Sequence, residues 1–121
     1  MDDPITRFFA AWQVESADAR SDLITAAVTA DVEYADPNAP APIHGAHALA
    51  EYVGMFSASA PGWSARVLVC DTIAETTRAT VAFGGPGPDG SDQQQLGQYF
   101  VEFRGEQISR MIGFVGIGAP A

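Results

Sequence analysis

Asp36 is the residue of this chain whose position most directly suggests chemistry. It ends a strand signal within the segment DVEYADPNAPAPIHG, residues 31–45, just before a proline-rich turn and a glycine that opens a helix. Because side chains alternate along a strand, Val32, Tyr34 and Asp36 should share one face. A carboxylate on an apolar face costs free energy unless it is used or hydrogen-bonded. Asp36 is therefore either a general base in apolar surroundings or the first residue of an Asx turn with Asn38.

Three helices and a set of strands are expected to position this carboxylate. Apolar residues recur at helical spacing over residues 4–15, 19–30 and 46–58. Beyond them the pattern predicts an antiparallel meander over residues 63–73, 76–83, 96–103 and 108–117. The polar, glycine-rich segment 84–95 is predicted to be a mobile hairpin tip. This order predicts an α+β fold, in which helices cover one concave face of a curved sheet and leave a cavity for a small apolar molecule.

The composition fits one compact domain, residues 1–121, and excludes several classes of function. Of the 121 residues, 47% are hydrophobic, which is enough for one core. The net charge is -9, with fifteen acidic residues against six basic ones, all of them arginines. This balance argues against a nucleic-acid or anionic-membrane partner. The absence of lysine excludes Schiff-base chemistry on a lysine side chain.

The sequence shows no sign of export, membrane insertion or cofactor binding. The N-terminus lacks the order of a signal peptide, no apolar run approaches a membrane span, and a single cysteine forms no internal disulfide. We therefore expect a cytoplasmic protein. Cys70 lies in an apolar run, where a buried and inert thiol is expected rather than a nucleophile. No phosphate loop or cofactor fingerprint is present, and we expect the protein to act without a cofactor.

The segment around Asp36 resembles a known family. Asp36-Pro37, a variable turn, Ile43-His44-Gly45 and the following amphipathic helix are similar to the pattern of ketosteroid isomerase and its SnoaL-like polyketide cyclase relatives, in the nuclear transport factor 2 superfamily. The resemblance spans nearly the whole chain, and its specific part is the spacing from Asp36 to Gly45. It implies a cone-shaped α+β barrel. It also implies that Asp36 is the base that shuttles a proton.

The resemblance points to two further polar residues. Counting back from Asp36, Trp12 falls where that family places its principal tyrosine donor, and counting back from Phe103, Tyr99 falls where it places a protonated acid. An altered pair of oxyanion donors is thus implied. The residues themselves leave alternatives open. Trp12 also fits a core anchor on an aromatic helix face, and a buried Tyr99 hydroxyl could bond a ligand oxygen or Asp36.

We therefore expect a cofactor-independent enzyme that moves a proton on a small apolar carbonyl compound, as an isomerase or polyketide cyclase does. The expected catalytic residues are Asp36, Tyr99 and Trp12. The residues expected to bound the same end of the cavity and bind substrate are Tyr34, Met55, Phe56 and Met111. The alternative is a non-catalytic ligand-binding or dimerisation module on the same fold, since superfamily membership does not separate the two.

Two other clusters of polar residues suggest weaker hypotheses. His47 and Glu51 lie one helical turn apart and could hold a metal, but no further metal-binding spacing accompanies them and none is expected. A strand arginine could join Asp36 and Asp71 in an arrangement like that of the related limonene epoxide hydrolase. Strand arginines usually lie on the solvated or dimer-facing side, however. The arginines concerned are Arg66, Arg78 and Arg110.

The second face of the sheet is expected to be a dimer interface. If alternation holds, Phe100 points there beside Gln98 and Glu102, with Ile112 and Phe114 on the next strand. A monomer of this size would expose that apolar patch to water. We therefore expect a homodimer built sheet to sheet.

Overall fold

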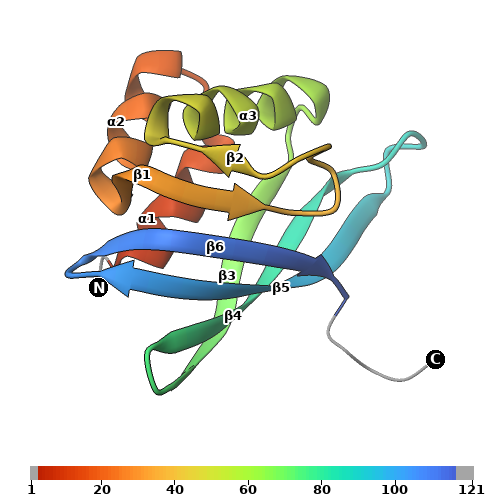
Figure 1. Cartoon of the computed structure of the whole chain (residues 1–121). Coiled ribbons are helices and arrows are strands. Elements are labelled where there is room, and N and C mark those ends of the chain that lie inside the picture. The colour runs from red at the N-terminus through yellow and green to blue at the C-terminus, as the bar shows by residue number, and fades with distance from the viewer. Residues whose placement is uncertain (1–2, 117–121) are drawn as a thin grey trace.

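Six strands form one curved sheet that carries the helices on one side (Figure 1). The computed structural model describes residues 3–116. The strands are β1 (Val28–Ala35), β2 (Ile43–His44), β3 (Ser64–Ile73), β4 (Thr76–Pro86), β5 (Asp92–Arg104) and β6 (Gln107–Val115). They lie in the order β2-β1-β6-β5-β4-β3. Neighbours are antiparallel except β1 and β6, which are parallel. The predicted α+β fold and the four-stranded meander are thus confirmed.

The helices are α1 (Pro4–Ala10), which continues into the 3-10 turn η1 (Ala11–Gln13), α2 (Ala17–Ala27) and α3 (Ala46–Ser59). Side-chain caps begin α1 and α2, whereas Gly45 precedes α3 without a side-chain cap. The Asp3 carboxylate accepts the Thr6 N–H at 2.8 Å, and the Ser16 hydroxyl accepts the Ala19 N–H at 3.2 Å. The second helix was predicted to continue to residue 30, but it ends at Ala27. The β-branched Val28 and Thr29 that follow it begin β1 instead.

Strand β1 lies inside the sheet, between β2 and β6. Its register places Tyr34 opposite Met111 of β6 and opposite Ile43 of β2. Val32 and Tyr34 are fully buried against the helices, as their alternation predicted. The chain then leaves the sheet at Asp36. The position of Asp36 is therefore determined by a strand that is paired on both sides.

The hairpin between β4 and β5 has a shorter tip than expected. Strand pairing continues as far as Pro86 opposite Asp92, so most of segment 84–95 is strand, and the prediction of a long mobile tip is wrong. Trp63 explains part of this extension, because its indole N–H donates to the Pro86 carbonyl at 3.0 Å. Gly85 permits this approach, since a Cβ there would lie 2.6 Å from the Trp63 ring. Strand pairing and the bond from Trp63 thus order a segment whose polar, glycine-rich composition is typical of a loop.

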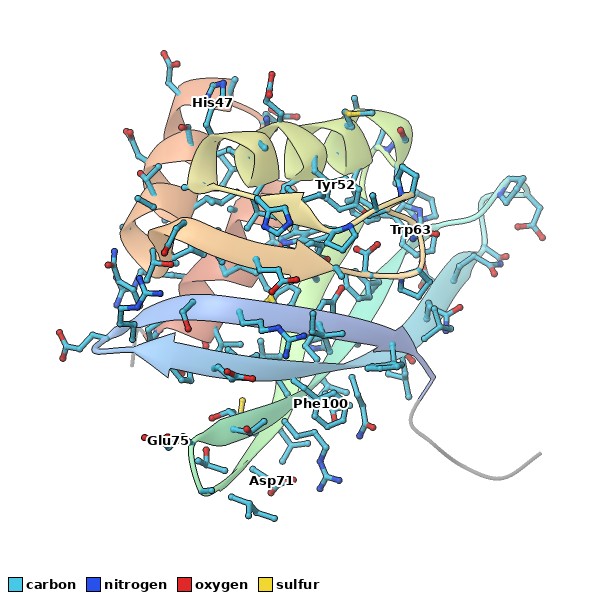
Figure 2. All side chains as sticks on the ribbon, in the orientation of Figure 1. His47, Tyr52, Trp63, Asp71, Glu75 and Phe100 are labelled. Carbon is cyan, nitrogen blue, oxygen red and sulfur yellow. The ribbon has the colours of Figure 1, made fainter. Side chains whose placement is uncertain are left out.

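The core lies between the helices and the inner face of the sheet. Its largest fully buried side chains include Tyr34, Phe8, Phe9, Ile24, Leu49, Ile108 and Met111. The far end of the β3–β4 hairpin extends beyond the helices, where Figure 2 shows Asp71 and Glu75. Cys70 lies in this part of β3 and is exposed, so the prediction of a buried thiol is wrong. Within residues 3–116, no helix is both long enough and apolar enough to cross a membrane.

Candidate active site

A cavity of about 210 Å³ lies between the helices and one end of the sheet. It is bounded by η1, α3, the turn after β1 and the adjoining parts of β4, β5 and β6. Tyr52 and Trp63, labelled in Figure 2, both contribute to its wall. Among the described residues that line it, Asp36 is the only one with a charged side chain. The full lining is Trp12, Asp36, Pro37, Asn38, Tyr52, Phe56, Trp63, Phe83, Gln95, Leu96, Gly97, Tyr99, Gly113, Phe114 and Val115.

One oxygen of the Asp36 carboxylate is held by the turn that follows β1. Oδ1 accepts the backbone N–H of Asn38 and that of Ala39, both at 2.9 Å. This is the Asx turn that the sequence suggested, formed by a residue that also lines the cavity. Asp36 can therefore be both the first residue of an Asx turn and a functional carboxylate. The turn uses only Oδ1, and Oδ2 makes no bond to the turn.

The three tyrosine hydroxyls of the chain lie around the same carboxylate. Tyr34 donates to Oδ2 at 2.5 Å, and Tyr52 lies 2.8 Å from Oδ1 and 2.9 Å from Oδ2. Tyr99 is 3.3 Å from the Tyr34 hydroxyl. Because the single Tyr34 proton goes to Asp36, Tyr99 must be the donor in that longer bond. A chain of hydroxyls thus runs from Tyr99 through Tyr34 to Asp36.

Burial keeps these phenols protonated. Desolvation, followed by the charges and hydrogen bonds of Tyr99 and Asp36, raises the pKa of Tyr34 well above its usual value. Desolvation is also the largest cause that raises the pKa of Tyr52 and the pKa of Tyr99, and the Asp36 charge acts in the same direction. All three side chains therefore act as hydrogen-bond donors near neutral pH. None of them is available there as a base.

We expect alkaline pH to unfold the protein by ionising these tyrosines in the unfolded chain. Their pKa values are near 10.0 when exposed and higher in the folded state, so the folded state binds more protons above pH 10. Their contribution to the free energy of unfolding is thus fully present below pH 10 and is lost as the pH rises through the folded-state values. Ultraviolet absorbance should show tyrosinate appearing together with the loss of circular dichroism. Tyrosinate that forms near pH 10 in a protein that is still folded would contradict this assignment.

Gly113 determines where the Tyr99 ring can lie. The two residues are paired across β5 and β6, and a Cβ on Gly113 would lie 2.5 Å from the Tyr99 ring. Real Cβ atoms essentially never approach so closely. The missing side chain lets the ring pack directly against Gly113 of β6, with its hydroxyl 3.3 Å from that of Tyr34. We therefore expect Gly113→Ala to displace Tyr99 and to weaken ligand binding, measured by tryptophan fluorescence. Unchanged binding by this variant would show that the position of the Tyr99 ring does not matter for the ligand.

Trp12 lies at the back of the cavity, within an aromatic cluster. It is 2% exposed, and its ring contacts Phe8, Phe9, Phe56 and Phe83 at centroid distances of 4.8 to 5.9 Å. Its indole N–H is buried and has no hydrogen-bond partner within residues 3–116. A buried donor without a partner costs free energy. Trp12 is thus the core anchor that the sequence suggested, and it also carries an unused donor next to the cavity.

The other predicted cavity residues have different outcomes. Phe56 lines the cavity, whereas Tyr34 and Met111 are buried in the core and are not part of the described lining. Tyr34 contributes to the site through its bond to Asp36. Met55 is 68% exposed, so the prediction that it bounds the cavity is wrong. Successive helical residues are rotated by about 100°, and it is Phe56 that faces inward.

Four aromatic residues of the lining were not predicted to lie there: Tyr52, Trp63, Phe83 and Phe114, the last of which was expected on the outer face of the sheet. Tyr52 had a detectable signal, because it lies one helical turn before Phe56 and therefore on the same face of α3. Phe83 continues the inward alternation of Ala79 and Val81 along β4. For Trp63, which lies just before β3, we see no comparable signal.

The weaker hypotheses about polar clusters find no support at this site. His47 and Glu51 are 3.8 Å apart on the exposed surface of α3, and no group of three metal-ligating side chains occurs within residues 3–116. Arg78 pairs with Asp71 at 2.8 Å, and Arg110 pairs with Glu33 at 3.1 Å. The described lining of the cavity includes no arginine. The structure therefore does not bring Asp36, Asp71 and an arginine together.

Known proteins share this fold. A proposed isomerase of the SnoaL-like family from Agrobacterium tumefaciens has a TM-score of 0.79 and 22% identity, covering 94% of this chain and 95% of that one. A protein with a ketosteroid isomerase-like fold from Catenulispora acidiphila, in complex with trimethylamine, has a TM-score of 0.75 and 16% identity, covering 91% and 82%. TerC, co-crystallised with polyporic acid, has a TM-score of 0.75 and 13% identity, covering 93% and 88%. Identities at this level establish a common fold and nothing finer.

The sequence itself establishes the family. No curated protein matches the chain. The sequence profile of the SnoaL-like domain, by contrast, matches residues 5–111, which include Asp36, Tyr52 and Tyr99. The resemblance noted around Asp36 therefore reflects membership, and the protein belongs to the SnoaL-like domain family.

Proposed function

We propose that the protein is a small-molecule enzyme of the isomerase or cyclase type, which moves a proton on an apolar carbonyl compound with Asp36 as acid and base. The observation that carries the proposal is a single carboxylate in a cavity lined largely by aromatic side chains. A cavity of about 210 Å³ exceeds the roughly 150 Å³ that holds benzene and is smaller than most drug-sized pockets. The substrate is therefore a small molecule.

The two oxygens of Asp36 would have different roles. Oδ1 is held by the Asn38 and Ala39 amides, which cannot leave it without opening the turn. Oδ2 accepts only from the hydroxyls of Tyr34 and Tyr52, and Tyr52 can keep its bond to Oδ1. Oδ2 is therefore the oxygen that takes the proton. The C–H bond next to the substrate carbonyl breaks, its electron pair forms the enolate, and Oδ2 later returns the proton to another carbon.

The enolate oxygen requires a hydrogen-bond donor, and Tyr99 is the side chain best suited to this role. Its present bond to Tyr34 is long, at 3.3 Å, so little is lost when the hydroxyl turns toward a ligand. Its raised pKa keeps the proton in place. Trp12 also lines the cavity, and its buried indole N–H would be a second donor if the ring turned toward the ligand. Together they would provide the electrostatic stabilisation that enolate formation needs.

A non-catalytic binding module is the second candidate, and one observation favours it. Asp36 already accepts four donors, from Tyr34, Tyr52, Asn38 and Ala39, which is about the full capacity of a carboxylate. A carboxylate in this state can serve to hold tyrosines in place and need not take a proton.

Exchange of hydrogen for deuterium distinguishes the two candidates. Enones, diketones and small cyclic ketones would be incubated with the protein in heavy water and followed by proton NMR. An enzyme of the proposed type should catalyse deuterium uptake at the carbon next to the carbonyl of at least one compound. Binding without exchange across the series would favour the binding module.

We also propose that the outer face of the sheet forms a homodimer. Phe100 and Phe114 are 37% and 56% exposed there, and their rings pack edge to face at 5.7 Å. Beside them Arg110 bridges Glu33 and Glu102, so the apolar patch has a charged border. An exposed apolar patch with a polar border is typical of an interface.

Substitution of Phe100 tests the dimer. We expect sedimentation velocity to show a dimer at micromolar concentration for the unaltered protein and a monomer for Phe100→Asp, because a charge would be buried without a partner. Met55→Asp is the matched control, since Met55 is exposed on α3, away from the sheet. A monomeric unaltered protein, or a Phe100→Asp variant that remains dimeric, would show that this face is not the interface.

A further inference from the structure

The negative charge in the cavity has no positive partner. Asp36 forms no ion pair with any residue from 3 to 116, and neither arginine nor histidine occurs in the described lining. The chain contains no lysine and carries a net charge of -9. A partly buried carboxylate surrounded by aromatic rings favours a cation, and the field of the whole protein attracts one. An anionic ligand would be repelled both by Asp36 and by the net negative charge of the protein.

The hydrogen bonds of Asp36 restrict which cation can bind. An ammonium group with N–H donors needs acceptors, but the acceptor sites of this carboxylate are already taken by Tyr34, Tyr52, Asn38 and Ala39. A quaternary ammonium has no N–H and makes no such demand. It requires only a nearby negative charge and the faces of aromatic rings. The saturated carboxylate therefore suits a fully alkylated cation better than a primary amine.

The aromatic walls favour a compact, rounded group. Trp12, Phe56 and Phe83 stand at 62° to 68° to one another, with ring centroids 4.8 to 6.0 Å apart. These three rings form a corner, whereas a flat molecule would need parallel walls on which to stack. All three line the cavity together with Tyr52 and Tyr99. A trimethylammonium group has the shape to fill such a corner within about 210 Å³.

We infer that this cavity binds a quaternary ammonium group, with the aromatic rings around it and Asp36 as its counter-charge. The inference goes beyond the proposed enzyme function, because it does not require Asp36 to transfer a proton. A bound ammonium would occupy the space proposed for the carbonyl substrate and would compete with it.

A pair of matched ligands tests the inference. Choline and its uncharged carbon analogue 3,3-dimethylbutan-1-ol have nearly the same shape and differ in charge. Titration calorimetry and tryptophan fluorescence should show that choline binds at least about tenfold more tightly. Equal or tighter binding of the neutral analogue, or binding of neither, would overturn the inference without any variant being made.

Two substitutions locate the site. Asp36→Asn should abolish the preference for choline, whereas Asp22→Asn, the same change at an exposed position of α2, should preserve it. A preference that survives Asp36→Asn in a protein that circular dichroism shows to be folded would place the cation elsewhere and refute the inference.

Deuterium exchange on carbonyl compounds is measured separately, so the two proposals can fail independently. Exchange without choline binding would leave the enzyme proposal standing and refute this one. Choline binding without exchange would support this inference and refute the enzyme proposal.

Discussion

Asp36→Asn is expected to reduce turnover of a carbonyl substrate by a factor of about 10² to 10⁴, because it removes the proton acceptor. The fold should persist, since the asparagine oxygen can still accept the Asn38 and Ala39 amides. Its NH₂ group would face Tyr34 and Tyr52, whose hydroxyls can turn and accept from it. We expect stability to fall by about 1–3 kcal/mol, measured by urea denaturation, with kcat measured on the first compound found active in the exchange screen.

A substitution outside the cavity separates this effect from a general loss of charge. Asp22→Asn makes the same chemical change at an exposed position of α2 and should alter kcat and stability little. If Asp36→Asn keeps kcat within about tenfold of the unaltered protein, general-base catalysis by Asp36 is refuted. The carboxylate would then be a structural group that holds the turn and the tyrosines.

Tyr99→Phe is expected to lower kcat by a factor of about 10² or more, through loss of the donor to the enolate oxygen. The effect on KM should be smaller, because the hydroxyl interacts most strongly with the charge that develops in the transition state. Side-chain volume hardly changes, and the hydroxyl lost is the outermost of the chain that leads through Tyr34 to Asp36. The measurement is steady-state kinetics on the same compound.

Thr80→Val is a suitable control for the loss of a hydroxyl. Thr80 accepts from Gln98 and is paired with it in the sheet, on the face opposite Tyr99. Its substitution removes a hydroxyl group while keeping nearly the same volume, and should leave kcat unchanged. A Tyr99→Phe variant with unaltered kcat but a raised KM would mean that Tyr99 binds the ground state only.

The sequence predicted Asp36 as a residue of the candidate site more readily than it predicted the residues around Asp36. Asp36 was predictable because a carboxylate that ends an apolar strand face is unusual and needs a local explanation. Its bond to Tyr52 depends on how α3 packs against β1, which helical periodicity alone does not determine. The same uncertainty explains the wrong prediction for Met55, because a helical pattern locates the apolar face of a helix only to within about one residue. The role of Gly113 could not be predicted for a similar reason. Gly113 makes room for the Tyr99 ring only because the register of β5 and β6 places the two residues opposite each other.

The fold class followed from the order of helical and strand periods, whereas the place of β1 in the sheet did not. The four meander strands are sequential neighbours, and short turns specify their pairing. Strand β1 instead pairs with β6, far along the chain, and Tyr34 lies opposite Met111. Pairing across such a separation leaves no local signal. The exposure of Cys70 has a related cause, because it depends on how far the helices extend over β3.

The parallel pairing of β1 with β6 has a consequence for how the protein is made. On the ribosome, β1 emerges early, but its long neighbour β6 is the last of the described strands to be synthesised. Until β6 arrives, Tyr34 lacks one of its two flanking strands, and Tyr99 lacks the glycine strand over which its ring lies. A ligand of this cavity therefore cannot assist early folding of the nascent chain. It can stabilise only a chain whose residues through Val115 have been released and paired, so ligand binding can stabilise the fold only late in synthesis.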